Sequence, residues 1–285
     1  MAYTQKEIVD YYNYCESDYA RLWNLGSSMA MHAGFWDYKV RTLQEALERE
    51  NQILSELAKI TASDHVLDAG CGVGGSSIYL AKRCHCQVTG ITLSSQQVER
   101  AKNFAASHGV SDQTEFKVMD FCHTDFPDNS FDVVWAIESV CHAENFSDFL
   151  KEAYRLLKPN GRIVIADGFL SDRPLKSKEK AGLKRWLSGW KVGSLPSVSE
   201  FLLSLKTHRF ADISFQDVTQ KVMPSSKRLF YLSIPTIFLS KLGEYVNLRK
   251  KVQTDNLISA FYQHLTLKKG VWKYAIVLAE KKSDL

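Results

Sequence analysis

The chain has 285 residues, of which 45% are apolar and 24% charged, and its formal net charge is +4. This balance predicts a globular protein with a sizeable core, in one large domain or two small ones. The sequence has no apolar run near the roughly 20 residues that span a bilayer, and its first residues, MAYTQKEIVD, lack the basic and apolar regions of a secretory signal.

The first sixty residues are expected to form a helical segment ahead of the main fold. Within them, residues 40–60 carry leucine and isoleucine at spacings that place these side chains on one face of an amphipathic helix.

The segment HVLDAGCGVGGSSIYLAKR, residues 65–83, predicts a strand at His65–Asp68 and a helix at Ser76–Lys82. Four glycines fall within the six residues from Gly70 to Gly75. Glycine is costly to order unless the chain needs an unusual backbone angle or a close approach of another group to the backbone. We therefore expect a ligand to lie against this turn.

Strands and helices alternate beyond the glycine turn. Further strands are expected at Gln87–Ile91, Thr114–Val118, Phe131–Ile137 and Arg162–Ala166, and helices from Ser94 or Ser95 to Ser107 and from Phe146 to Leu157. Such alternation predicts an α/β fold, in which a mostly parallel, doubly wound sheet has helices on both faces. Ligands of these sheets bind beyond the carboxyl ends of the strands.

The pattern loosens after Phe169. Helices are expected at 175–191, 199–206 and 256–264, and strands at 213–218 and 272–279. The apolar run LFYLSIPTIFL, residues 229–239, is expected to be interrupted at Pro235. The chain is thereby divided into a helical lid (1–60), a ligand-binding core (61–219), a substrate cap (220–270) and a strand that returns to the sheet (271–285).

Charge is distributed unevenly along the chain. Residues 1–170 carry 15 lysines and arginines against 23 aspartates and glutamates, whereas residues 171–285 carry 21 against 9. The basic C-terminal part either meets an anionic partner or is a solvated basic surface. Because Lys227, Arg228 and Lys241 flank the apolar run, the cap suits a lipid with an anionic head, an isoprenoid diphosphate or peripheral contact with an anionic membrane, unless it packs on its own core.

The chain has six cysteines, which are expected to be reduced thiols in a cytoplasmic protein because no export signal precedes them. Cys84-His85-Cys86 is the one fragment with a metal-like composition. Its spacing differs from that of zinc sites and no second ligand pair follows, so we expect no bound metal.

Gly70, Gly72 and Gly75 match the G-x-G-x-x-G pattern of dinucleotide sites, which alone is weak evidence. A nicotinamide site needs an acidic residue about 20 residues later. The chain has TGITLS at residues 89–94 instead, which disfavours a nicotinamide-dependent oxidoreductase.

The motifs VLDAGCGVGG, VTGITLSSQQVERAK, VMD, FPDNSFDVVWAIES and LLKPNGRIVIAD, in this order, resemble the class I S-adenosylmethionine-dependent methyltransferases. The resemblance is close over residues 60–170. AIESVCHAENF and HAGFWD are similar to segments of sterol and tocopherol C-methyltransferases and of bacterial natural-product (prenyl and sugar) methyltransferases, and ITLS to cyclopropane fatty acid synthases. The resemblance implies a Rossmann-like, seven-stranded sheet with an N-terminal helical lid and a C-terminal cap insertion.

The resemblance also implies S-adenosyl-L-methionine as the cofactor. In this family the glycine turn holds the methionine end and the ribose, and an acidic residue accepts a bond from the adenine amino group. The positions that match are Asp68, Gly70, Gly72, Thr92, Gln97, Asp120 (adenine), Phe121 (beside the ring), Ala136 and Trp36. Trp36 and the tyrosines Tyr11, Tyr12, Tyr14 and Tyr19 are candidates for a lid over the cofactor, and the alternative for each tyrosine is packing on the core.

Glu138, His142 and Asp167 follow the fourth and fifth predicted strands, so we expect them at the ligand crevice. By resemblance, Glu138 matches an active-site glutamate of prenyl and sterol C-methyltransferases, while His142 and Asp167 match catalytic positions proposed in sugar O-methyltransferases. The alternatives are a glutamate that only shapes the cofactor site and a histidine bonded to a backbone carbonyl.

Methylation of an alkene leaves a carbocation, which aromatic faces stabilise and a base then deprotonates, whereas a hydroxyl needs a base for attack. We expect C-methylation of an isoprenoid, sterol-like or lipid substrate. O- or N-methylation of a polyketide, sugar or phenol is the alternative, and a non-catalytic cofactor- or lipid-binding protein is a third reading. The sequence has no N/D-P-P-Y motif or RNA-binding signature, so nucleic acid is not an expected partner, and it carries no signal for an oligomeric state.

Overall fold

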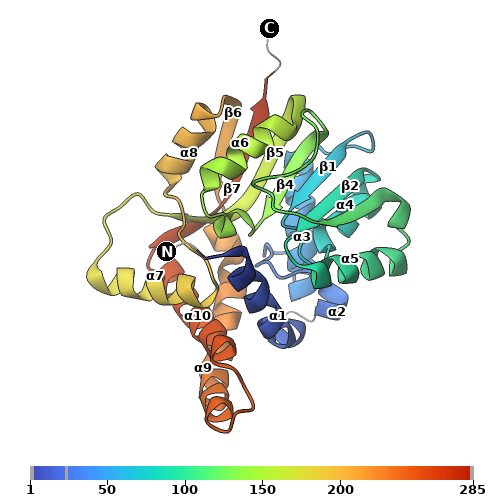
Figure 1. Cartoon of the computed structure of the whole chain (residues 1–285). Helices are drawn as coiled ribbons and strands as arrows, with labels where there is room; N and C mark the ends of the chain where they lie inside the picture. Colours follow the sequence, from blue (N-terminus) through green and yellow to red (C-terminus); the bar gives the residue numbers. More distant parts are fainter. Residues whose placement is uncertain (1–2, 23–24, 283–285) are drawn as a thin grey trace.

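The computed structural model describes residues 3–22 and 25–282, which form one seven-stranded sheet flanked by helices (Figure 1). The strands are β1 (His65–Ala69), β2 (Gln87–Thr92), β3 (Thr114–Val118), β4 (Phe131–Ile137), β5 (Leu157–Leu170), β6 (Phe210–Asp217) and β7 (Trp272–Lys281). Their order is β3-β2-β1-β4-β5-β7-β6, and β7 runs antiparallel to both of its neighbours while the other pairs are parallel. This is the predicted mostly parallel, Rossmann-like sheet.

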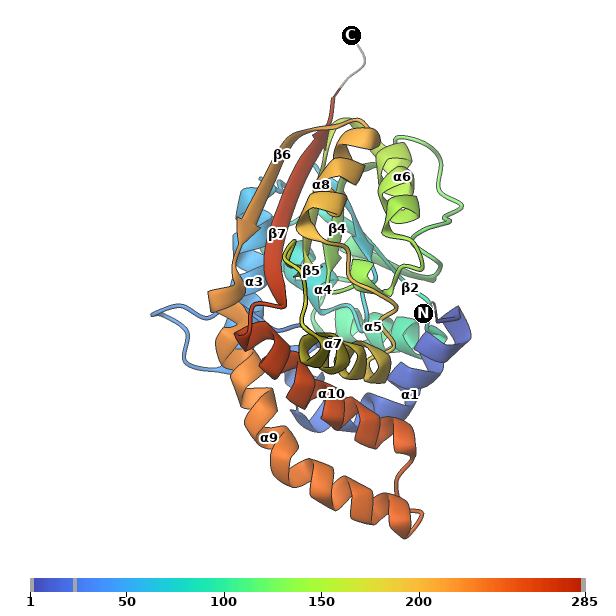
Figure 2. The same cartoon turned by 90° about the vertical axis from the view of Figure 1, so that its left-hand side faces the viewer.

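The helices form a layer on each face of the sheet and a group beyond its carboxyl edge (Figures 1 and 2). They are α1 (Gln5–Leu22), α2 (Leu25–Ser28), α3 (Leu43–Leu57), α4 (Gly75–Cys84), α5 (Ser95–Ser107), α6 (Phe146–Leu156), α7 (Ser177–Gly189), α8 (Val198–Thr207), α9 (Thr219–Tyr245) and α10 (Lys251–Lys268). One buried cluster joins the sheet to α3, α4 and α5, and a second joins the opposite face to α6 and α8. The two faces are therefore both covered, as a parallel sheet requires.

The predicted elements of the core lie close to where the sequence places them. Strands β3 and β4 have the predicted bounds, and α5 begins after Ser94, whose side chain accepts a hydrogen bond from the Gln97 backbone N–H as an N-cap does. β5 is longer than the predicted 162–166, because its pairing with β7 continues from Arg162 to Leu170.

The C-terminal region differs from the prediction at Pro235. Helix α9 runs unbroken through Pro224 and Pro235, and α10 continues well beyond the predicted 256–264. Proline removes one backbone hydrogen bond and crowds the preceding turn, which bends a helix more often than it ends one when the affected turn faces solvent. Pro235 is exposed, and α9 curves along its length in Figure 2. The expected interruption was therefore wrong.

α7, α9 and α10 pack together beyond the sheet edge, with α1 against α10 (Figure 2). α7 lies within the segment that the sequence assigns to the core, yet its main neighbour is α10. α9 and α10 form an antiparallel hairpin whose turn projects away from the sheet (Figures 1 and 2). Within residues 3–22 and 25–282, no helix combines the length and the apolar character needed to cross a membrane.

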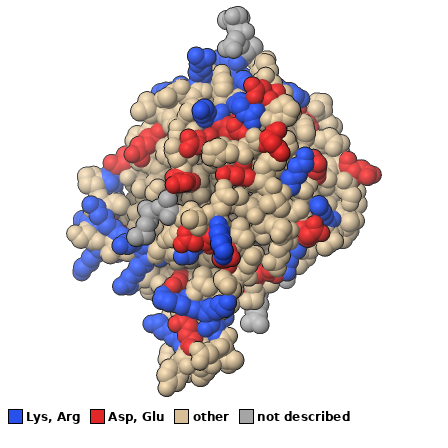
Figure 3. Space-filling view, viewed as in Figure 1, with Lys and Arg blue, Asp and Glu red and all other residues tan. Residues whose placement is uncertain are grey.

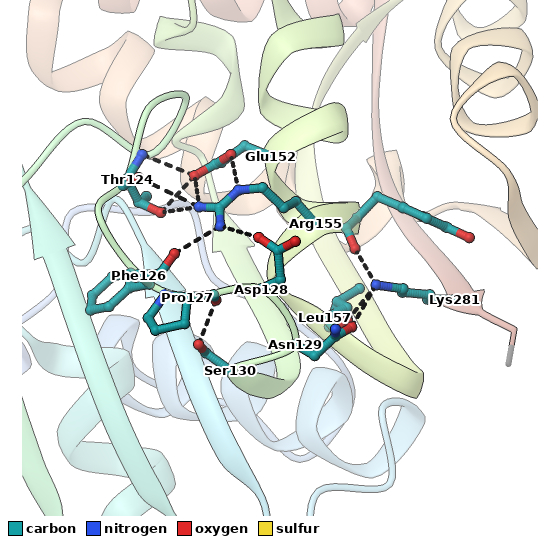
Figure 4. A network of polar contacts seen from close by, with 11 residues as sticks. Thr124, Phe126, Pro127, Asp128, Asn129, Ser130, Glu152, Arg155, Leu157 and Lys281 are labelled. Carbon is teal, nitrogen blue, oxygen red and sulfur yellow. Dashed lines mark hydrogen bonds and ion pairs between the residues drawn. The ribbon is translucent and has the colours of Figure 1, made fainter. Parts of the chain in front are cut away.

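Arg155 joins the loop before β4 to α6 (Figure 4). Its guanidinium donates to the Glu152 and Asp128 carboxylates and to the Phe126 and Thr124 carbonyls. Lys281 of β7 donates nearby to the Leu157 carbonyl. This network holds the amino end of β4, at the opposite end of the strand from the crevice, and so supports the strand that carries Glu138.

Candidate active site

A large cavity opens at the carboxyl ends of β1, β2, β4 and β5, between the sheet and helices α1, α7, α9 and α10. It contains roughly 1770 Å³ of empty space, counting its open mouth. Nine predicted site residues line it: Asp68, Gly70, Gly72, Thr92, Gln97, Phe121, Glu138, His142 and Asp167.

The glycines of the turn after β1 have different surroundings, and so a glycine is needed for a different reason at each position. An added Cβ would lie 2.4 Å from Ser139 Cβ at Gly70 and 2.1 Å from the Met29 carbonyl oxygen at Gly75, so these two glycines admit protein neighbours. At Gly72 the nearest atom would be Met31 Cε at 3.4 Å. Gly72, with φ of +53°, is the position where the backbone is open to the cavity. The expectation of a ligand against the turn therefore applies to Gly72, while close packing explains Gly70 and Gly75.

Asp68 ends β1 beneath this turn. Its Oδ2 accepts a 2.6 Å hydrogen bond from Ser77 Oγ of α4. Burial raises the pKa of Asp68 to about 6, and the Ser77 bond opposes the shift. Asp68 is thus a buried acceptor, held in place from the first turn of α4.

Thr92 and Gln97 lie at the end of β2 and the start of α5. Thr92 Oγ1 donates a 2.6 Å hydrogen bond to Gln97 Oε1, and both residues line the cavity. The pair supplies hydrogen-bonding groups where many dinucleotide sites have a carboxylate.

Three predicted cofactor residues are not among the described residues that line the cavity. Asp120 accepts hydrogen bonds from Gln5 Nε2 and from the Cys122 backbone N–H. Ala136 is fully buried in the cluster on the α6 side of the sheet. Trp36 donates its indole N–H to Ser225 Oγ at 2.7 Å.

Glu138 follows β4 with a left-handed backbone, φ of +48°. Its N–H donates to the Ala166 carbonyl of β5, and its Oε1 accepts a 2.7 Å bond from the Ala33 N–H. Burial first, and then the charge of Glu50, raise the pKa of Glu138 to about 8. A strained backbone that aims a poorly solvated carboxylate into a cavity is typical of a functional site.

A buried network beside Glu138 joins three parts of the chain. Glu50 of α3 has no exposed surface, and its carboxylate contacts His32 Nδ1 at 2.6 Å, the Gly34 N–H and the Tyr274 hydroxyl of β7. Glu50 and Tyr274 are not among the site residues predicted from the sequence. A glutamate on the buried face of a predicted amphipathic helix is the signal that could have identified Glu50, because a buried carboxylate needs partners.

His142 lies in a short turn after Glu138. Its Nε2 is 2.9 Å from the hydroxyl of Tyr12 of α1, and burial lowers the pKa of His142 to about 4. Burial also raises the pKa of Tyr12 well above its usual value, so this hydroxyl stays protonated. Both partners of this hydrogen bond are therefore neutral, and the tautomer of the imidazole decides which of them donates.

Asp167 of β5 is held by backbone groups. Its carboxylate accepts from the Cys141 N–H at 3.0 Å and from its neighbouring Gly168 N–H at 2.7 Å. Burial raises its pKa to about 6 against these bonds. The Cys141 contact ties β5 to the turn that carries His142.

Aromatic side chains surround the carboxylates. The described rings that line the cavity are Tyr11, Tyr12, Tyr19, Phe121, Trp186, Trp190, Trp272 and Tyr274. Three of the four predicted lid tyrosines are therefore at the cavity, whereas Tyr14 faces out and stacks against Lys250. Arg228 is the one lysine or arginine among the described lining residues, and it donates to the Leu22 carbonyl.

The sequence profile of the family described as "Methyltransferase domain" matches residues 67–165. The chain is 30% identical over 302 aligned residues to the chloroplastic tocopherol O-methyltransferase of Arabidopsis thaliana, covering 97% of this chain and 82% of that protein. It is 36% identical to a sterol 24-C-methyltransferase of Saccharomyces cerevisiae over 48% of this chain and 36% of that protein. The resemblance to sterol and tocopherol methyltransferases is confirmed, although the tocopherol relative is named for O-methylation rather than the expected C-methylation.

The fold is also found in solved structures. The crystal structure of the [4+2]-cyclase SpnF superposes with a TM-score of 0.80 at 24% identity, covering 100% of this chain and 98% of that one. A similarity at this level of identity establishes the architecture, and the chemistry has to be argued from the site.

Proposed function

The chain belongs to the S-adenosylmethionine-dependent methyltransferases, and within that family we propose that it methylates a carbon atom of a hydrophobic isoprenoid, sterol-like or lipid molecule. The observation that carries this proposal is Glu138, a carboxylate with a pKa near 8 in a cavity with aromatic walls. A base works best when its pKa lies near the working pH.

The cavity fits the cofactor. S-adenosylmethionine supplies a methyl group on a positively charged sulfur, and carboxylates and aromatic faces favour a cation. Asp68, Gly72, Thr92, Gln97 and Phe121 would hold it, with Gly72 allowing close approach of the backbone. Asp120, Ala136 and Trp36 do not line the cavity. We propose that they support the cofactor site indirectly, by holding the residues that they contact in place.

Glu138 would act as the base. Transfer of the methyl group to an alkene would break the bond between sulfur and the methyl carbon, leave its electrons on sulfur and place a positive charge on the adjacent carbon of the acceptor. The Glu138 carboxylate takes a proton from a neighbouring carbon, and the electrons of that C–H bond restore the double bond. Before that proton is removed, the aromatic rings that line the cavity would stabilise the carbocation of the acceptor. Their bulk would also exclude water that could react with this carbocation.

The acceptor is proposed to be neutral or to carry one negative charge. Arg228 is the single cationic side chain among the described lining residues, and a backbone carbonyl already takes one of its donors. A diphosphate would bring several charges into a cavity that also holds Asp68, Glu138 and Asp167, at a large electrostatic cost.

O-methylation of a phenol or related natural product is the second candidate. A relative of which this chain covers 82% is named as an O-methyltransferase. In this reading the Tyr12–His142 pair, or Glu138, would take the proton of the hydroxyl. The low pKa of His142 makes it the weaker base of the two.

The test is an acceptor panel with S-adenosylmethionine that carries a trideuterated methyl group. The panel contains squalene, a sterol, a tocopherol precursor, farnesyl diphosphate, an acyl phospholipid and simple phenols. The proposal expects one labelled methyl on a carbon of a neutral isoprenoid acceptor, located by mass and NMR. Labelling of only a hydroxyl oxygen would establish the second candidate instead.

A further inference from the structure

Helix α9 presents its large apolar side chains to solvent. Tyr231, Ile234, Phe238, Leu242 and Tyr245 recur every three or four residues and so share one face. All five are exposed, Phe238 by 73% and Tyr245 by 86%, and Leu248 in the hairpin turn is exposed by 82%. Contiguous exposed apolar surface of this kind marks an interaction site.

The face of α9 that packs on α10 carries a row of buried serines beside Leu229 and Phe230, and Phe230 stacks on Phe261 of α10. Ser226, Ser233 and Ser240 are spaced by seven residues and are buried against α10. Ser226 donates to Gln263 at 2.6 Å, and Ser240 is bonded to Thr254 at 2.7 Å. Hydroxyl bonds between packed helices, with apolar side chains on the outer face, also occur among helices in lipid.

Basic residues surround this apolar face. Lys227, Lys241 and Lys250 are exposed and form no ion pair with a carboxylate of the described chain. The neighbouring α7 adds a second basic group, and Figure 3 shows blue side chains over α7 and just above the uncharged tip of the hairpin. Between residues 238 and 251 the hairpin has four lysines and arginines and one glutamate.

We propose that the α9–α10 hairpin docks on a bilayer that contains anionic lipid, with the exposed face of α9 among the acyl chains and the lysines at the head groups. Apolar side chains beside cations, with tyrosines at the boundary, match the layers of such a surface. A second copy of this chain fits less well, because the hairpin is net positive and two copies that met through it would bring positive charge against positive charge.

The docked face lies beside the active site. Leu229 and Trp190 line both the main cavity and a smaller pocket that continues along α9 to Leu232 and Thr236. A lipophilic acceptor leaving the bilayer would meet this apolar surface before the cavity. The docking itself requires no acceptor, so it stands or falls independently of the proposed reaction.

The test is co-sedimentation of the full chain, without cofactor or acceptor, with vesicles of phosphatidylcholine alone or mixed with phosphatidylglycerol. We expect binding to the mixed vesicles that weakens as salt rises. Phe238→Ser/Leu242→Ser/Tyr245→Ser should lower the partition coefficient by at least about a hundredfold, since each buried apolar side chain is worth roughly tenfold. Lys241→Gln/Lys250→Gln should lower it by about tenfold or more, and only on the anionic vesicles.

Leu203→Ser is the matched control, because Leu203 is 65% exposed on α8, at the opposite end of the molecule from the hairpin (Figure 1). It should leave vesicle binding unchanged. Unchanged melting temperature and cofactor affinity would show that the hairpin variants are folded. Binding that is absent, or equal for the triple variant and the control, would overturn the proposal. The proposal would also be overturned if light scattering showed a wild-type dimer, a monomeric triple variant and no binding of the wild-type chain to vesicles.

Discussion

Replacing Glu138 by glutamine should remove a pH dependence from cofactor binding. The amide oxygen of glutamine can still accept the Ala33 N–H bond, so the local structure is kept while the titration is lost. In the wild-type chain, a cationic ligand favours the deprotonated form of Glu138. S-adenosylmethionine should therefore bind more tightly as the pH rises toward the Glu138 pKa of about 8 and level off above it.

The expected size follows from that pKa. A carboxyl group with a pKa near 8 is deprotonated in roughly 3% of molecules at pH 6.5 and in roughly three-quarters at pH 8.5. If binding requires the carboxylate, the affinity rises by about 25-fold over this interval. Asp68 and Asp167, with pKa values near 6, are already largely ionised there and add little.

The assay is calorimetric titration with S-adenosylmethionine and, separately, with S-adenosylhomocysteine, whose sulfur is neutral. The two ligands share an amino group that titrates near pH 8, so the ratio of their affinities isolates the effect of the sulfonium charge. The ratio should rise with pH in the wild-type chain and stay flat in Glu138→Gln. A flat ratio in the wild type, or a slope retained in the variant, would refute the assignment of this titration to Glu138.

Three further predictions concern stability. Because folding raises the Glu138 pKa from 4.5 to about 8, the wild type should lose about 1.4 kcal/mol of unfolding free energy per pH unit relative to Glu138→Gln between about pH 5 and 8, as measured by urea denaturation. Gly75→Ala should lower the free energy of unfolding by more than about 2 kcal/mol, because the added Cβ would overlap the Met29 carbonyl. Gly72→Ala should lower it by about 1 kcal/mol and should mainly weaken cofactor binding. Equal stabilities of the two variants would contradict the different packing of the two glycines. Arg155→Met should cost about 2 kcal/mol in thermal or chemical unfolding, and Lys151→Met, on the exposed side of the same helix, less than about 0.5; a similar loss in both would show that the network in Figure 4 adds nothing.

Local patterns explain why so much of the core was predictable. β4 is apolar at every position except Asp132 and is bounded by a turn, and α5 has a serine cap and a glycine after its end, so each carries its own start and stop signals. The same signals put Glu138 and Asp167 at the carboxyl ends of their strands, and the cavity brings these two side chains together.

Other features depend on contacts between distant segments, which leave weak traces in one sequence. Pro235 has the local signature of a helix end, but α10 packs along α9 and supports it through the proline. Glutamate is usually an exposed residue, and only the folded structure shows that Glu50 is buried in contact with His32 and Tyr274. Trp36 matches a family position, yet its indole bonds to α9, a segment that joins it only in the folded chain.

The most direct test of the account is the rate of methyl transfer to the preferred acceptor by Glu138→Gln, compared with His142→Asn, both at saturating cofactor. If Glu138 takes the proton, its loss should lower kcat by roughly 10²- to 10⁴-fold and leave the fold intact, with saturating cofactor offsetting the weaker cofactor binding, while His142→Asn stays within about tenfold of the wild type. Full activity in Glu138→Gln together with an inactive His142→Asn would contradict the central claim and assign the base to His142.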